Sequence, residues 1–160
     1  MATLIVFYSR DGNTRAVAKQ IAEATGGDLE ELVEKAVKRS GILGWIRSGR
    51  DGMFRRTSTI EPPKRSVDRY DTVFVGSPVW AGNLVPAVRS YLESVDLGGK
   101  RVGFFCTMSA SGDRKTFESM RGLASGATVF GELAVKESEI AESETLGKRL
   151  ADWIALGGAA

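Results

Sequence analysis

The residues best suited to bind a ligand follow the first apolar run of the chain. That run, LIVFY (residues 4–8), continues directly into SRDGNTRAVA (residues 9–18). Ser9, Asn13 and Thr14 carry polar side chains, and Gly12 allows close backbone approach because it lacks a Cβ atom. Backbone N–H groups in such a turn converge on one point, and the helix that follows adds its positive dipole. This chemistry suits a phosphate monoester, although the same residue types are also ordinary helix caps.

Several other kinds of site are excluded by the residues present. No Gly-Lys-Ser or Gly-Lys-Thr follows the first turn, so it is not a P-loop, and it lacks the Gly-x-Gly-x-x-Gly pattern of dinucleotide sites. The chain contains no histidine and one cysteine, Cys106, in the apolar run GFFC. Histidine-based triads and the usual zinc sites are therefore excluded, and we expect no metal. Cys106 is expected to be a buried core thiol, and any chemistry to come from a bound cofactor.

Two further loops place glycine and small polar residues after a strand-like run. The loop GSPVWAGN (residues 76–83) contains Trp80, which we expect either to expose a flat face for a planar ring or to pack beneath its own loop. The loop CTMSASGD (residues 106–113) offers Thr107, Ser109 and Gly112, with Asp113 as a candidate helix cap. If all three loops lie at the same edge of one sheet, they form a single pocket.

Segments with the apolar pattern of strands alternate along the chain with segments that have the apolar spacing of helices. These elements must position the three loops. Apolar runs at residues 4–8, 72–75, 102–106 and 128–135, with a weaker one at 29–33, predict five strands. Between and after them, apolar residues recur at helical spacing. The alternation predicts an α/β fold, a three-layer α/β/α sandwich whose five-stranded parallel sheet has the order 2-1-3-4-5. Ligands bind such sheets at the carboxyl ends of the strands.

The 160 residues fit one domain, 1–160, with a net charge of +2 and a pI near 8.8. Ten basic and three acidic residues lie between Lys35 and Arg69, which leaves +7 in that span. We interpret residues 36–66 as an elaborated basic loop within the domain, with a short helix around Ile42–Arg47. No apolar run is long enough to span a membrane, and the N-terminus lacks a signal-peptide pattern. These features favour a cytoplasmic protein with no membrane partner.

The three loops together resemble those of flavodoxins and flavodoxin-like FMN-binding proteins. YSRDGNT resembles the phosphate loop, GSPVWAG the first flavin loop and TMSASGD the second, and the resemblance covers the chain from residue 3 to about residue 156. It implies a non-covalent FMN cofactor. It also implies that the phosphate is held by Ser9, Arg10, Gly12, Asn13 and Thr14. On one side of the flavin ring it places Pro78, Val79, Trp80, Ala81 and Gly82, and on the other side or along the pyrimidine edge Thr107, Met108, Ser109, Gly112 and Asp113.

Three features depart from the pattern of that family. Asp11 replaces the usual Ser or Thr of the phosphate loop, so its carboxylate must point outward or pair with Arg10 or Arg15. The second flavin loop has no aromatic residue, which leaves the face opposite Trp80 open or covered by Met108. Typical flavodoxins are acidic, whereas this chain is basic. We therefore expect less negative reduction potentials than in an acidic flavodoxin.

The resemblance implies an electron-transfer flavoprotein that shuttles electrons between redox partners. Acidic partner proteins would dock near the flavin or the basic 36–66 segment. The alternative on the same fold is an FMN-dependent reductase of quinones or other small acceptors, with NAD(P)H as reductant, because an open flavin face gives a substrate room. In either case we expect no catalytic side chain. A non-catalytic nucleic-acid-binding module is less favoured, because a solvated basic loop that docks acidic proteins explains the same charges.

Overall fold

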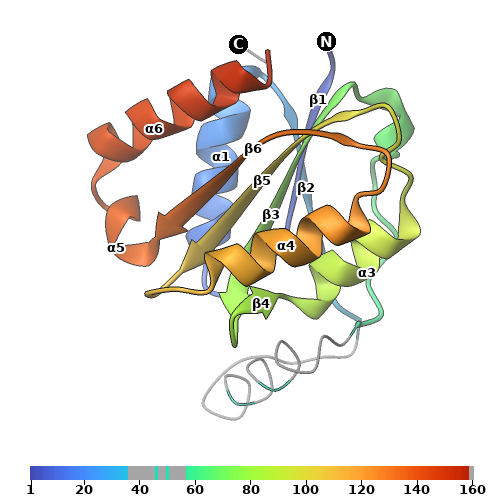
Figure 1. Cartoon of the computed structure of the whole chain (residues 1–160), viewed down its shortest axis with the longest axis horizontal. Coiled ribbons are helices and arrows are strands. Elements are labelled where there is room, and N and C mark those ends of the chain that lie inside the picture. The colour runs from blue at the N-terminus through green and yellow to red at the C-terminus, as the bar shows by residue number, and fades with distance from the viewer. Residues whose placement is uncertain (36–45, 47–49, 51–56, 159–160) are drawn as a thin grey trace.

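The chain forms a parallel sheet covered by helices on both faces (Figure 1). The computed structural model describes residues 1–35, 46, 50 and 57–158, so most of the predicted basic loop and the predicted helix around Ile42–Arg47 lie outside the described residues. The parallel strands are β1 (Thr3–Phe7), β2 (Asp28–Glu31), β3 (Thr72–Trp80), β5 (Arg101–Met108) and β6 (Thr128–Lys136). Their order is β2-β1-β3-β5-β6. The predicted order 2-1-3-4-5 is confirmed, because β4 (Asn83–Leu84) is an added two-residue strand antiparallel to the end of β3.

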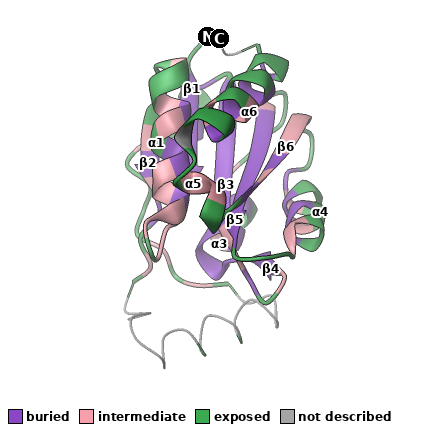
Figure 2. Ribbon diagram, turned by 90° about the vertical axis from the view of Figure 1, so that its left-hand side faces the viewer, coloured by how far each residue is buried: buried purple, intermediate pink, exposed green. Residues whose placement is uncertain are grey.

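Helices cover the two faces of the sheet in pairs. One face carries α1 (Asn13–Thr25) and α6 (Ser143–Leu156), with the short α5 (Glu137–Ile140) beside them. The other carries α3 (Pro86–Ser94) and α4 (Asp113–Leu123), and the turn η1 (Val67–Arg69) precedes β3. Figure 2 shows the buried strands between these helices. The helices present apolar residues to the sheet at the spacing expected of one-sided helices, as in α1, where Val17, Ala18 and Ile21 are buried.

The strands are buried on both sides because each face has its own apolar core. All five residues of β1 are buried. Leu4 and Val6 pack into the core beneath α3 and α4, whereas Ile5 and Phe7 pack into the core beneath α1 and α6. This alternation follows from the two-residue repeat of a strand. It explains why the run LIVFY is continuously apolar, as is typical of parallel sheets.

The topology brings the three predicted loops to one edge of the sheet. Because the paired strands are parallel, the segments that follow β1, β3 and β5 all emerge at the carboxyl edge. The start of β1 and the end of α6 both lie at the opposite end of the molecule (Figures 1 and 2). The carboxyl edge of the sheet therefore carries the candidate site, and the amino edge carries the chain ends.

Cys106 lies in β5 with no exposed surface, as the sequence predicted. Burial raises the pKa of its thiol well above the ordinary value, so the side chain stays neutral at physiological pH. Since the thiolate is the reactive form, we expect a maleimide to leave the native protein unmodified and to label it only after denaturation. Mass spectrometry after a timed exposure checks this. Rapid labelling of the native chain would contradict the burial of Cys106.

Candidate functional site

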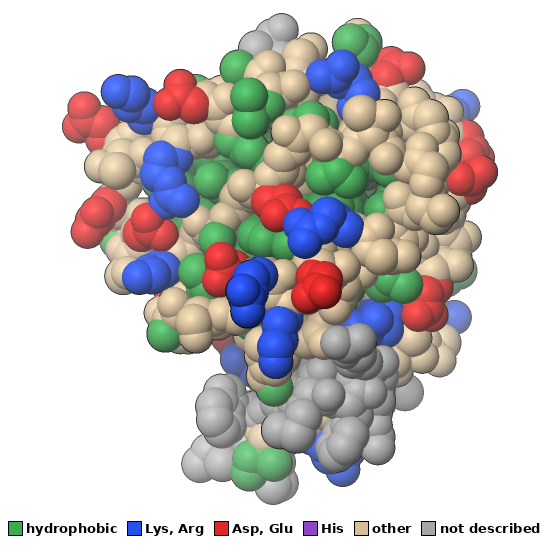
Figure 3. Space-filling view, viewed as in Figure 1, with side chains coloured by type: hydrophobic (Ala, Val, Ile, Leu, Met, Phe, Trp, Pro, Cys, Tyr) green, Lys and Arg blue, Asp and Glu red, His purple; other side chains and the backbone are tan. Residues whose placement is uncertain are grey.

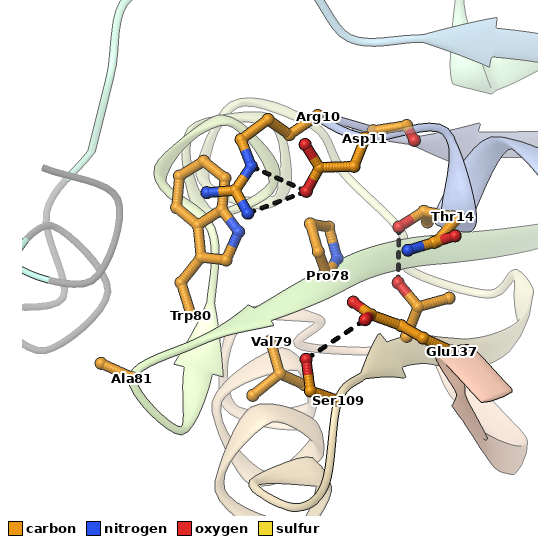
Figure 4. A pocket seen from close by; sticks show the side chains of 12 residues that line it. Arg10, Asp11, Thr14, Pro78, Val79, Trp80, Ala81, Ser109 and Glu137 are labelled. Carbon is orange, nitrogen blue, oxygen red and sulfur yellow. Dashed lines mark hydrogen bonds and ion pairs between the residues drawn. The ribbon is translucent and has the colours of Figure 1, made fainter. Parts of the chain in front are cut away.

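A groove lies at the carboxyl ends of β1, β3 and β5 (Figure 4). Its volume is about 180 Å³, below the roughly 300–1,000 Å³ of pockets that enclose a drug-sized ligand, so a ligand of nucleotide size would extend into solvent. All three predicted loops contribute to its wall, together with the start of α5. The lining residues are Ser9, Arg10, Asp11, Asn13, Thr14, Pro78, Val79, Trp80, Ala81, Thr107, Ser109 and Glu137.

The first loop folds as an oxygen-binding turn at the start of α1. Gly12 is the residue before the helix and has φ 94°, a left-handed conformation that glycine adopts without a Cβ penalty. The backbone N–H groups of Gly12 and Arg15 both donate to the Ser9 Oγ atom, at 3.1 and 3.3 Å. Main-chain donors therefore converge on an oxygen atom at a helix N-terminus. That oxygen is the hydroxyl of Ser9 itself, and it lies at the kind of helix N-terminus where proteins also bind phosphate oxygens.

Trp80 ends β3 and forms the aromatic part of the groove. Of the two alternatives that the sequence left open, the structure favours a packed tryptophan, because only 6% of the residue is accessible. Its ring meets Tyr8 edge to face with centroids 5.7 Å apart, and the Arg10 guanidinium lies over it at 5.4 Å from the centroid. Trp80 still lines the groove, so burial against Tyr8 holds the ring in place. The turn that follows is left-handed at Ala81 (φ 49°) and Gly82 (φ 72°).

The second flavin loop is joined to the other two by specific contacts. The buried hydroxyls of Thr14 and Thr107 lie 2.7 Å apart in a hydrogen bond that links the phosphate loop to the end of β5. Gly112 has φ 111°, and a Cβ atom placed there would lie 2.9 Å from the Gly82 Cα atom. The second flavin loop can pack this closely on the first only because residue 112 is glycine. The three loops thus form one continuous wall.

Ten of the fifteen predicted site residues line the groove, and five do not. The five that do not are Gly12, Gly82, Met108, Gly112 and Asp113. Met108 is buried at the end of β5, so it does not cover the face opposite Trp80. Asp113 is the first residue of α4 and makes no side-chain cap, because Gly112 occupies the position before the helix.

Two acidic residues that were not among the predicted site residues also line the groove. Asp11 pairs with Arg10 and has a 59% exposed side chain, which resolves the conflict between a carboxylate and a phosphate loop in the way expected. Glu137, exposed at the start of α5, accepts a hydrogen bond of 3.2 Å from the Ser109 Oγ atom. Sequence patterns gave no signal for Glu137, because only the fold brings the end of β6 beside β5.

Arg15 points away from the groove although it follows the phosphate loop. Its guanidinium makes two hydrogen bonds to the Glu31 carboxylate, at 2.9 and 2.5 Å. These hydrogen bonds raise the pKa of Arg15. Arg15 therefore links α1 to β2. The charged residues that line the groove are Arg10, Asp11 and Glu137. Within the described residues, no cluster of acidic or cysteine side chains could hold a metal ion.

This fold and this groove define a class of protein, the α/β sandwiches that bind a nucleotide cofactor at the carboxyl edge of a parallel sheet. A family model described as flavodoxin matches residues 2–155. The chain belongs to the flavodoxin family. None of the curated protein sequences matches the chain significantly.

Solved structures share the fold over nearly the whole chain. A Bacteroides uniformis protein described as a flavoprotein is 24% identical, with a TM-score of 0.80, over 96% of this chain and 97% of its own. A Lactobacillus acidophilus flavoprotein in complex with FMN is 21% identical, with a TM-score of 0.69, over 88% and 97%. Oxidised flavodoxin 2 from Bacillus cereus is 20% identical, with a TM-score of 0.65, over 99% and 98%. At 20–24% identity, these likenesses show that the fold is shared over nearly the whole length of each chain.

Proposed function

We propose that this chain binds FMN non-covalently and carries electrons between redox proteins. The observation that carries the proposal is the groove itself, which joins the start of α1, where backbone N–H groups gather around the Ser9 hydroxyl, to the wall formed by Trp80. Two properties of the structure fit FMN. The turn at Ser9 and Gly12 suits a phosphate monoester, and Trp80 and Pro78 provide flat apolar surface for a ring. The partial enclosure of the groove leaves part of the cofactor accessible to a partner protein.

The residues of the chain bind and orient the cofactor, and FMN supplies the redox chemistry when bound. The backbone N–H groups around Ser9, with the side chains of Asn13 and Thr14, would hold the phosphate. Pro78 to Ala81 would bound the ring on the side of β3, and Thr107 and Ser109 on the side of β5. The Thr14–Thr107 hydrogen bond fixes the distance between the two halves of this site.

A reductase of quinones or other small acceptors is the second candidate, and one observation favours it. Ser109, Ala110 and Ser111 of the second flavin loop are all exposed, and none carries an aromatic ring that could cover a flavin. A planar acceptor could therefore reach the ring directly. Cellular localisation in the cytoplasm remains part of the proposal. Among the described residues, no helix combines the length and the apolarity needed to span a bilayer.

Steady-state kinetics separate the carrier from the reductase. The FMN-loaded chain is mixed with NADH or NADPH and a water-soluble quinone, and nicotinamide oxidation is followed by absorbance. A carrier should show turnover near the rate of free FMN, and addition of a flavodoxin reductase should then raise the rate of reduction. Turnover well above free FMN without a partner reductase would instead identify the chain as an enzyme.

Acidic redox proteins are the proposed partners, on the evidence of the basic span from Lys35 to Arg69. On the face seen in Figure 3, acidic and basic side chains are interspersed over the described part of the molecule. Docking on a basic surface should accelerate association at low ionic strength and weaken as salt is added. A rate of electron exchange that is independent of salt would remove the electrostatic part of the proposal.

Removal of the carboxylate at Glu137 is expected to strengthen FMN binding. Glu137 lines the groove and is exposed, so the effect should resemble a surface charge pair, about 0.4–1 kcal/mol or a two- to fivefold lower Kd for the Glu137→Gln variant. Fluorescence titration with FMN checks this, and Glu144→Gln on α6 is a control of the same charge. The expectation fails if both variants bind FMN as the wild type does.

A further inference from the structure

We propose that Arg10 acts on the ring of the bound flavin and not on its phosphate, and that its positive charge favours the reduced cofactor. This inference rests on the proposed FMN function. The resemblance to flavodoxins implied a phosphate role for Arg10, because the residue belongs to the phosphate loop. The geometry points to the ring instead, because the Arg10 guanidinium lies over Trp80, the aromatic residue of the groove wall.

The Arg10 side chain turns from its own loop toward β3. Its guanidinium carbon lies 5.4 Å from the centroid of the Trp80 ring, a cation–π distance. Figure 4 shows the guanidinium beside Trp80, with Thr14 farther along the groove. The oxygen position at the start of α1 is served by main-chain N–H groups around Ser9 instead. A delocalised, planar guanidinium is the cation suited to stack with rings, so a flavin would share this wall with Arg10.

Asp11 fixes the direction in which the charge of Arg10 acts. The Asp11 Oδ2 atom accepts hydrogen bonds from Arg10 Nε at 2.9 Å and from Arg10 Nη2 at 2.8 Å. The Asp11 side chain is 59% exposed and the Arg10 side chain only 19%. Water and salt therefore screen the carboxylate more than the guanidinium. Both residues line the groove, but the positive end of the pair is the less exposed end and lies over the Trp80 ring.

One nitrogen of Arg10 is left to interact with a ligand. Arg10 Nη1 is buried and has no hydrogen-bond partner among the described residues. A buried donor without an acceptor is costly, so a shift of the guanidinium that brings Nη1 to a ligand oxygen or nitrogen would gain a charge-assisted hydrogen bond. Two carboxylates also line the groove: Asp11, which is paired with Arg10, and Glu137, which is exposed and accepts a hydrogen bond from Ser109 on the β5 side. Arg10 is therefore the group that places charge beside Trp80.

The consequence is a preference for the reduced ring. The oxidised ring is neutral, and uptake of two electrons from a redox partner with one proton from water leaves it with a negative charge. A cation held at the ring stabilises that form more than the neutral form. We expect loss of the cation to lower the ratio of reduced to oxidised FMN affinity about tenfold, which for a two-electron couple corresponds to about 30 mV.

Titrations of the full chain with FMN and with riboflavin, which lacks the phosphate, separate the two possible roles of Arg10. The variants are Arg10→Gln, Asp11→Asn and, as a matched control, Arg69→Gln in η1 at the opposite edge of the sheet. Kd is measured for both flavins, and the two-electron potential of bound FMN is measured by equilibration with redox dyes. A ring role predicts that Arg10→Gln changes both Kd values by the same factor and lowers the potential by about 30 mV.

The Asp11→Asn variant should shift the potential in the opposite direction, because it removes the carboxylate and keeps the cation. Arg69→Gln should leave all three quantities unchanged. If Arg10→Gln weakens FMN binding much more than riboflavin binding, Arg10 is a phosphate ligand and the proposal is overturned. An unchanged potential in Arg10→Gln overturns it as well. If the wild-type chain binds neither flavin, the proposed function itself fails, and the role of Arg10 falls with it.

Discussion

Replacement of Trp80 by alanine is expected to weaken FMN binding about 10- to 100-fold, because stacking on an aromatic side chain contributes about 1–3 kcal/mol. Trp80 lines the groove and is held by Tyr8, edge to face at 5.7 Å. A ring that is already held loses little conformational entropy when a ligand binds against it. The variant also removes the surface over which the Arg10 guanidinium lies. Quenching of FMN fluorescence on titration with each protein gives the two Kd values.

Two comparisons make the Trp80 result specific to the ring. Trp80→Phe keeps an apolar ring and should recover much of the lost affinity. Riboflavin should lose affinity for Trp80→Ala by the same factor as FMN, because the phosphate is held elsewhere. Circular dichroism must show that the variant is folded, since Trp80 is also part of the core below α3 and α4. A folded Trp80→Ala protein that binds FMN as tightly as the wild type would contradict the proposed ring site.

The largest effect on stability is expected from Gly76→Ala. Gly76 lies in the central strand β3, and a Cβ atom there would lie 2.1 Å from the Cζ atom of Phe105. Phe105 is fully buried against the helices of that face, so its ring cannot move aside without disturbing them. Overpacking of this kind costs about 2–3 kcal/mol. For a chain of this size, the loss should lower Tm by roughly 6–12 °C.

Gly147→Ala is the matched control for Gly76→Ala. Gly147 lies within α6, and a Cβ atom there would meet nothing within 4 Å. Alanine is favoured over glycine in a helix interior by about 1 kcal/mol, so this variant should be more stable than the wild type. Calorimetry or denaturant unfolding measures both. If Gly76→Ala unfolds at the temperature of the wild type, the close packing of Phe105 on β3 is wrong.

The fold could be predicted because the spacing of the apolar residues shows which segments are strands and which are helices. The run LIVFY is apolar throughout, since β1 lies between two cores, and the helices show one apolar face each. The extra strand β4 could not be predicted, because Asn83–Leu84 is too short to show a repeat. Its pairing depends on the left-handed turn at Ala81 and Gly82, which brings the chain back onto β3.

The site was harder to predict than the fold, because side-chain directions are set by contacts between loops. Glycine and small polar residues located the three loops, and ten of the expected residues line one groove. The burial of Trp80 follows from its packing on Tyr8, which follows the neighbouring strand β1. The direction of Arg10 follows from its contacts with Asp11 and Trp80. Glu137 enters the groove because β6 pairs with β5. Only the pairing of Asp11 with Arg10 could be anticipated from the sequence, because the contacts of Trp80 and Glu137 join segments far apart in the chain.

Titration of FMN with the purified full chain tests the central claim most directly. Quenching of FMN fluorescence is followed to its endpoint, with the visible spectrum recorded alongside and riboflavin titrated in parallel. The account predicts saturation at one FMN per chain, perturbed flavin bands and weaker binding of riboflavin, because the turn at Ser9 and Gly12 binds the phosphate. FMN that keeps its fluorescence and its spectrum at every protein concentration would contradict the assignment of the groove as a flavin site.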